Sequence, residues 1–78
     1  MDKAQGEQWQ KLCDEHERAM RDYQDAQGVL TWKFAAIARG NSQENPTARD
    51  IDRAEVALQR LSDATATMNA FVRRHSLE

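Results

Sequence analysis

Apolar residues recur every seven positions in two stretches of this chain, and this repeat restricts the possible folds more than any other sequence feature. Alternating steps of three and four residues place such side chains on one stripe of an α-helix. Each stretch continues for about four heptads, which predicts two long helices that face each other. The predicted seam consists of Trp9, Met20, Tyr23, Leu30, Phe34 and Ile37 in the first stretch and Ile51, Leu58, Leu61, Met68 and Val72 in the second.

A polar segment with helix-breaking residues separates the two stretches. Gly40 is typical of a helix C-terminus, because glycine accepts the left-handed backbone conformation found there. Asn45 followed by Pro46 is typical of a helix N-terminus, with asparagine as the cap and proline in the first turn. Thr47 with Asp50 three residues later is a competing cap.

These signals predict a helix over about residues 3–39, a loop over about 40–45 and a second helix over about 46–75. Gly28 lies inside the first helix, yet the repeat continues across it in phase, so we expect no break there. The final two residues, 77–78, resemble the remnant of a cloning site and are left out of the prediction.

A short loop between two long helices makes them antiparallel neighbours. At 78 residues the chain forms one domain at most, and its β-branched residues never alternate as they do in strands. The predicted fold class is therefore all-α, an antiparallel two-helix hairpin packed like a coiled coil. Because two helices bury only one stripe each, chains this small usually need oligomerisation, and we expect two hairpins to pair into a four-helix bundle.

Composition argues against several classes of function. Lys and Arg together number 11 against 13 Asp and Glu, and a net charge of −2 argues against a nucleic-acid-binding face. No run approaches the roughly 20 apolar residues of a membrane span, and the first residues lack the apolar core of a signal peptide. Cys13 is the single cysteine, which suits a reducing compartment, so we expect a cytoplasmic protein.

Catalysis finds little support in the sequence. There is no nucleophile elbow, glycine-rich phosphate loop or HExxH motif. Most carboxylates of the first helix alternate with basic residues at i,i+4 spacing, a pattern typical of a solvated helix face. We therefore expect no enzyme activity, no catalytic residues and no cofactor.

A metal site is the one chemical alternative that the residue types allow. Cys13 and His16 lie three residues apart on one helix face, and an antiparallel register brings His75 to the same end of the hairpin. Thiolate and imidazole are zinc ligands. A cysteine that packs as a small apolar residue, with histidines at the edge of a seam, explains the same pattern without metal. We expect these three residues to be structural.

The end of the first helix carries a second apolar stripe that the predicted seam does not use. Val29, Trp32 and Ala36 lie roughly opposite Phe34, and Val56 lies at the same level of the second helix. Tryptophan is enriched at the centre of protein interfaces. We expect Val29, Trp32, Ala36 and Val56 to form the contact with a second chain, with Trp32 buried in it.

Together these features predict a non-catalytic protein–protein interaction module, a homodimeric helical-hairpin adaptor or regulator whose partner is a second copy or another helical protein. In architecture alone, the chain resembles small two-helix proteins of bacterial type III secretion, which have this size and a central polar loop containing proline. That resemblance implies an alternative role, as a secretion-type chaperone or needle-like subunit that completes its core with another chain. A metal-binding protein that uses Cys13, His16 and His75 is a third possibility.

Overall fold

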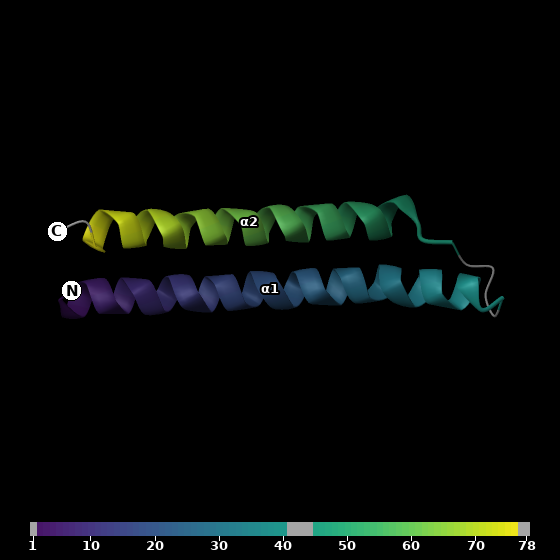
Figure 1. The fold of residues 1–78 in the computed structure, drawn as a ribbon, viewed down its shortest axis with the longest axis horizontal. Coiled ribbons are helices and arrows are strands. Elements are labelled where there is room, and N and C mark those ends of the chain that lie inside the picture. Colours follow the sequence, from purple (N-terminus) through teal and green to yellow (C-terminus); the bar gives the residue numbers. More distant parts are fainter. Residues whose placement is uncertain (1, 41–44, 77–78) are drawn as a thin grey trace.

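Two antiparallel helices make up the fold (Figure 1). The computed structural model describes residues 2–40 and 45–76, with α1 spanning Lys3–Ala38 and α2 spanning Ala48–Ser76. The helices lie side by side in a rod of 57 × 17 × 16 Å, with the start of α1 and the end of α2 at the same end. The predicted fold class, an all-α antiparallel two-helix hairpin, is confirmed, whereas the pairing of two hairpins stays a prediction.

Local signals fix both ends of α1. The Asp2 carboxylate accepts a hydrogen bond from the Gln5 backbone N–H at 2.9 Å, and the Gln5 side-chain oxygen accepts one from the Asp2 N–H at 3.0 Å. The helix continues through Gly28, as the unbroken repeat predicted. It stops before Gly40, where φ is +72° and the N–H donates to the Ile37 carbonyl at 2.9 Å, which confirms the predicted glycine stop.

α2 begins two residues later than predicted, because Thr47 and not Asn45 caps it. The Asp50 N–H donates to the Thr47 hydroxyl at 3.1 Å, and the Thr47 N–H donates to the Asp50 carboxylate at 2.9 Å. This reciprocal pair satisfies two backbone donors, whereas a single cap side chain satisfies one. Residues 41–44 of the predicted loop and the predicted cloning remnant at 77–78 lie outside the described residues.

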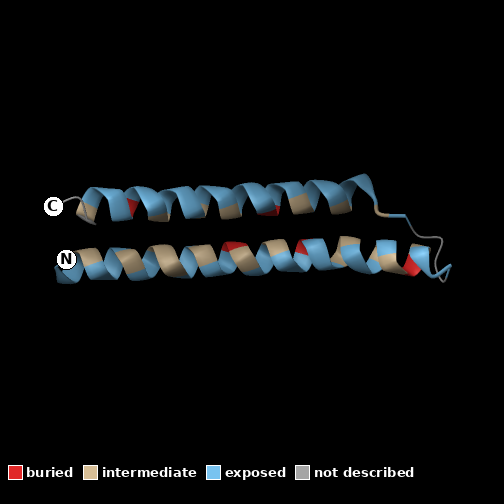
Figure 2. Ribbon diagram, viewed as in Figure 1, coloured by how far each residue is buried: buried red, intermediate tan, exposed pale blue. Residues whose placement is uncertain are grey.

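The two helices share a thin core. The buried residues of the described chain are Ala19, Ala26, Ala36, Ala57 and Phe71, and none of them is completely shielded. Small side chains on facing sides let two helices approach closely. Figure 2 shows that most residues of both helices are exposed to solvent. Neither helix, over the residues described, has a stretch of the length and apolarity needed to cross a bilayer.

Candidate functional site

One row of residues from each helix lies in the seam between α1 and α2. The members of each row are spaced by seven residues and are half-buried in the hairpin. They are Trp9, His16, Tyr23, Leu30 and Ile37 on α1, and Ala54, Leu61, Met68 and His75 on α2.

In the second row of the predicted seam, Met20 is half-buried, whereas the other four predicted members are exposed. Phe34 is 59% exposed, and Ile51, Leu58 and Val72 are 43%, 49% and 44% exposed. The seam instead holds residues one position earlier, so each helix is rotated by about half of the 100° that separates neighbouring residues. These residues are Leu12, Ala19, Ala26 and Lys33 on α1, and Asp50, Ala57, Ala64 and Phe71 on α2.

Aromatic packing maintains this rotation at the end of the hairpin where α1 begins and α2 ends, which we call the open end. The rings of Trp9 and Phe71 have centroids 5.6 Å apart, and the Phe71 ring contacts that of His75 at 4.4 Å. The Gln5 side-chain nitrogen lies 3.0 Å from His75 Nδ1, so the residue that helps to cap α1 also joins it to the end of α2. Phe71, which the heptad pattern did not predict in the seam, is therefore its largest buried side chain among the described residues.

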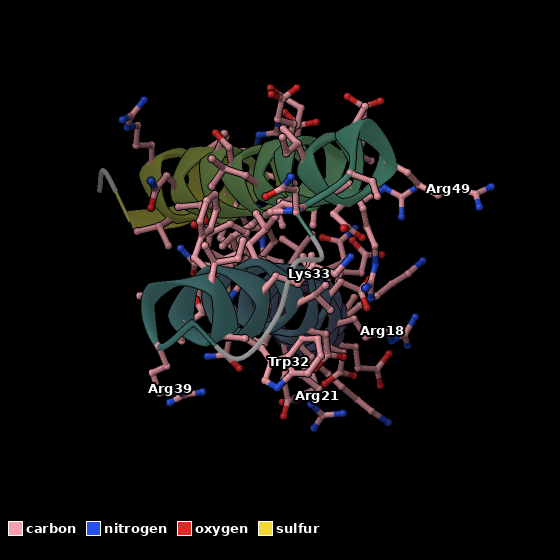
Figure 3. The ribbon with its side chains drawn as sticks, turned by 90° about the vertical axis from the view of Figure 1, so that its right-hand side faces the viewer. Arg18, Arg21, Trp32, Lys33, Arg39 and Arg49 are labelled. Carbon is pink, nitrogen blue, oxygen red and sulfur yellow. The ribbon has the colours of Figure 1, made fainter. Side chains whose placement is uncertain are left out.

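An ion pair holds the rotation at the loop end. Lys33 Nζ lies 2.5 Å from Asp50 Oδ2, and the two side chains are only 16% and 19% exposed. The hydrogen bond from Lys33, with a second from the Thr47 backbone, lowers the pKa of Asp50 from 3.8 to about 2. Figure 3 shows Lys33 directed between the two helices. Large side chains such as Phe34 and Leu58 cannot occupy the seam while the alanines and this pair hold the helices close.

These second rows follow one side of the hairpin, which we call the apolar face; six of its eight members are exposed, and two of the exposed members, Gln27 and Thr65, are polar. Tyr23, Gln27 and Leu30 of α1 line a shallow groove there together with Ile51 and Leu58 of α2, which places the two displaced rows on the same side. Glu55 and Ala54 complete the lining of that groove. The apolar face consists of Cys13, Met20, Gln27 and Phe34 on α1 and Ile51, Leu58, Thr65 and Val72 on α2, and none of these eight residues is charged.

The opposite side of the hairpin carries charges of both signs, and we call it the charged face. Three shallow grooves follow this side from the loop end to the open end. Figure 3 shows Arg18 and Arg49 pointing out on this same side, from different helices. The charged residues that line the grooves are Lys11, Glu15, Arg18, Asp22, Arg49, Asp52, Arg53, Arg60, Asp63 and Arg74.

The four residues predicted as an interface differ in how far the structure leaves them exposed, and their joint contact with a partner stays a prediction. Trp32 is 59% exposed and points away from α2 (Figure 3), while Val56 is 52% exposed and lies in a groove beside arginines 53 and 60. Val29 is half-buried, and Ala36, at 7% exposed, is already covered within its own chain. Ala36 therefore offers no surface to a partner, and a contact through Trp32 stays a prediction.

The three residues considered as metal ligands do not gather into one group in the described part of the chain. His16 is half-buried in the seam, Cys13 is half-buried on the apolar face, and His75 is engaged with Gln5 and Phe71 at the open end. Within residues 2–40 and 45–76, no three histidine, cysteine or carboxylate side chains gather as a metal site requires. Cys13, His16 and His75 are thus not brought together by the fold.

Comparison of the chain with protein-family models, with curated proteins and with solved structures gives no match. The hairpin itself offers two surfaces of different chemistry, the apolar face and the charged face. Of these, the apolar face is the candidate functional site, because several large exposed apolar side chains on one side typically mark a surface that contacts another molecule.

Proposed function

We propose that this hairpin is a non-catalytic protein–protein interaction module that acts as a homodimer, in the role of an adaptor or regulator. The observation that carries the proposal is the row of large apolar side chains left exposed along one side of the two helices. Phe34, Ile51, Leu58 and Val72 are all more than 40% exposed, while the buried core of the described residues is four alanines and one phenylalanine. Such an arrangement is typical of a unit that gains its core by association.

The surface area of the chain supports this proposal quantitatively. A compact monomer of this mass exposes about 4,800 Å², whereas the hairpin exposes 6153 Å². The excess, roughly 1,300 Å², is larger than the ~800 Å² that each partner contributes to a stable interface of standard size. The radius of gyration of 17.6 Å likewise exceeds the ~11.5 Å expected for a compact domain of 78 residues.

The chemistry of the exposed surface favours a helical partner over a small substrate. Its grooves are shallow and run along the helices, so they are suited to side chains of another helix and not to the enclosure of a reacting group. The half-buried thiol of Cys13 is compatible with a reducing compartment, and we propose the cytoplasm as the site of action.

Sedimentation equilibrium of the purified chain over the micromolar concentration range tests the proposal. We expect twice the chain mass of 8.9 kDa, with dissociation on dilution. A mass of one chain throughout that range would contradict self-association, and a chain that is monomeric but gains helix content with another protein would favour the alternative role of completing a core with a different partner.

A further inference from the structure

We infer that the apolar face of one chain packs against the apolar face of a second copy, so that the four helices of two hairpins form one bundle. The inference rests on the proposed self-association and assigns the surface that makes it. It replaces the interface predicted around Trp32 with one centred on Phe34, Ile51 and Leu58.

The number of apolar rows on each helix is the first argument. Helices that pair only with one another use two rows of a heptad, whereas helices that face the core of a bundle use three. α2 has its two seam rows, represented by Ala57 and Leu61, and a third row that contains Ile51, Leu58 and Val72. α1 has the same arrangement of three rows. Within the hairpin each helix has only one neighbouring helix, which covers two of these rows and leaves the third without a helix packed against it.

The distribution of charge is the second argument, and it favours a second copy as the occupant. In a two-fold dimer the same surface meets itself, so residue i of one copy contacts residue j of the other, and a charge near the axis faces its own copy. The eight residues of the apolar face include no charged side chain, and Glu55 is the charged residue that lines the groove there, whereas ten charged residues of both signs line the grooves of the charged face. Pairing through the apolar face therefore brings few charges into the contact, Glu55 at its edge among them, and it leaves the charged face in water.

The third argument compares the excess exposed surface of the hairpin with the area that a dimer interface buries. Covering the apolar face of each chain removes surface from the side that holds Phe34, Ile51, Leu58 and Val72, four of the six large apolar residues that are exposed in the described part of the chain. The other two, Trp32 and Val56, lie on different helices, and Val56 has charged neighbours. An interface of standard size fits within the excess surface of the hairpin, so a single second copy is sufficient to restore a compact particle.

Leu58 and Val56 provide a matched pair of variants for the test. They lie two positions apart on α2, and their exposed fractions are nearly equal at 49% and 52%. An aspartate at either position should therefore change the stability of the single hairpin by a similar amount. Leu58→Asp buries two unpaired charges in the inferred dimer, and we expect the dimer dissociation constant to rise by about 100-fold or more. Val56→Asp should keep it within about threefold of the original value.

A substitution that should strengthen the dimer provides a second test, because a variant that merely unfolds would not bind more tightly. Thr65 on the apolar face and Thr67 on the charged face are both exposed, and each donates a hydrogen bond to the carbonyl four residues earlier, at 2.9 Å. Thr65→Leu adds apolar surface to the inferred interface, so the dissociation constant should fall by about tenfold. Thr67→Leu has the same effect on the helix and should leave the constant unchanged.

Sedimentation equilibrium of the full chain and the four variants separates the two levels of the proposal. Weakening by Leu58→Asp with tightening by Thr65→Leu supports the assigned face. A dimer that survives Leu58→Asp, or that is lost in Val56→Asp, overturns the face while self-association stands. A chain that is monomeric without any substitution overturns the proposed function itself.

Discussion

The Lys33 ammonium of α1 lies 2.5 Å from the Asp50 carboxylate of α2, inside the seam at the loop end of the hairpin. The same carboxylate accepts the Thr47 backbone N–H and so takes part in the cap of α2. One side chain therefore both starts the second helix and sets its rotation against the first. This double use explains why the seam runs through positions 33 and 50, and not through the larger side chains one position later.

Acidification should weaken the hairpin through Asp50. Its pKa is about 2 in the folded chain against an ordinary value of 3.8, so folding favours the ionised carboxylate. The stabilisation from this group is complete above about pH 4 and is lost as pH falls toward 2. Urea unfolding followed by circular dichroism at a fixed protein concentration should show the midpoint falling across this interval.

Asp50→Asn provides the control for this pH dependence. The amide cannot ionise, so the variant should be less stable at pH 7 and should lose less stability between pH 4 and pH 2 than the original chain. Equal losses for both chains across that interval would show that other carboxylates account for the acid sensitivity.

The heptad repeat predicted the fold class, the antiparallel arrangement and the passage of α1 through Gly28, because these depend only on period and on breaker residues. It did not predict the rotation of the helices. Phe34 and Leu58 are larger and more apolar than Lys33 and Ala57, and a pattern read by hydrophobicity places the larger residues inside. The close approach that alanine permits and the Lys33–Asp50 pair are properties of both helices together.

Enlarging a seam alanine should destabilise the hairpin. Ala26 is 2% exposed, so Ala26→Leu inserts atoms into a fully packed position of the seam and should cost about 1–3 kcal/mol of unfolding free energy. Ala66 is exposed on α2, and Ala66→Leu should change stability by less than about 0.5 kcal/mol. Chemical denaturation of both variants measures the difference, and equal stabilities would contradict the observed seam.

Two glycines should respond to alanine in opposite directions. A Cβ at Gly28 meets no atom within 4 Å, so Gly28→Ala should stabilise the continuous helix by about 0.5–1 kcal/mol. Gly40 has φ of +72°, which a side chain disfavours, so Gly40→Ala should destabilise the chain by about 1 kcal/mol. Thermal unfolding of the two variants checks both signs, and a destabilised Gly28→Ala would indicate that another helix approaches there.

The sequence predicted the apolar rows of the candidate site but not which surface they contact. The residues of the apolar face that were predicted as seam, such as Phe34 and Leu58, were correctly recognised as apolar rows with a common period. Their partner was predicted to be the other helix of the same chain, because the sequence alone does not reveal that alanines 19, 26, 57 and 64 already fill that role. Trp32 was predicted as an interface residue because tryptophan is common at interfaces. Its predicted companion Ala36 is covered within its own chain and offers no surface to a partner.

The comparison of Phe34→Asp with Trp32→Asp tests most directly which surface joins two chains. The two residues lie on opposite sides of α1, and each is 59% exposed in the hairpin, so the substitutions differ mainly in the face they alter. The mass of each variant by sedimentation equilibrium is the decisive measurement. Pairing through the apolar face predicts a monomer for Phe34→Asp and a dimer for Trp32→Asp, and the reverse pattern would contradict it.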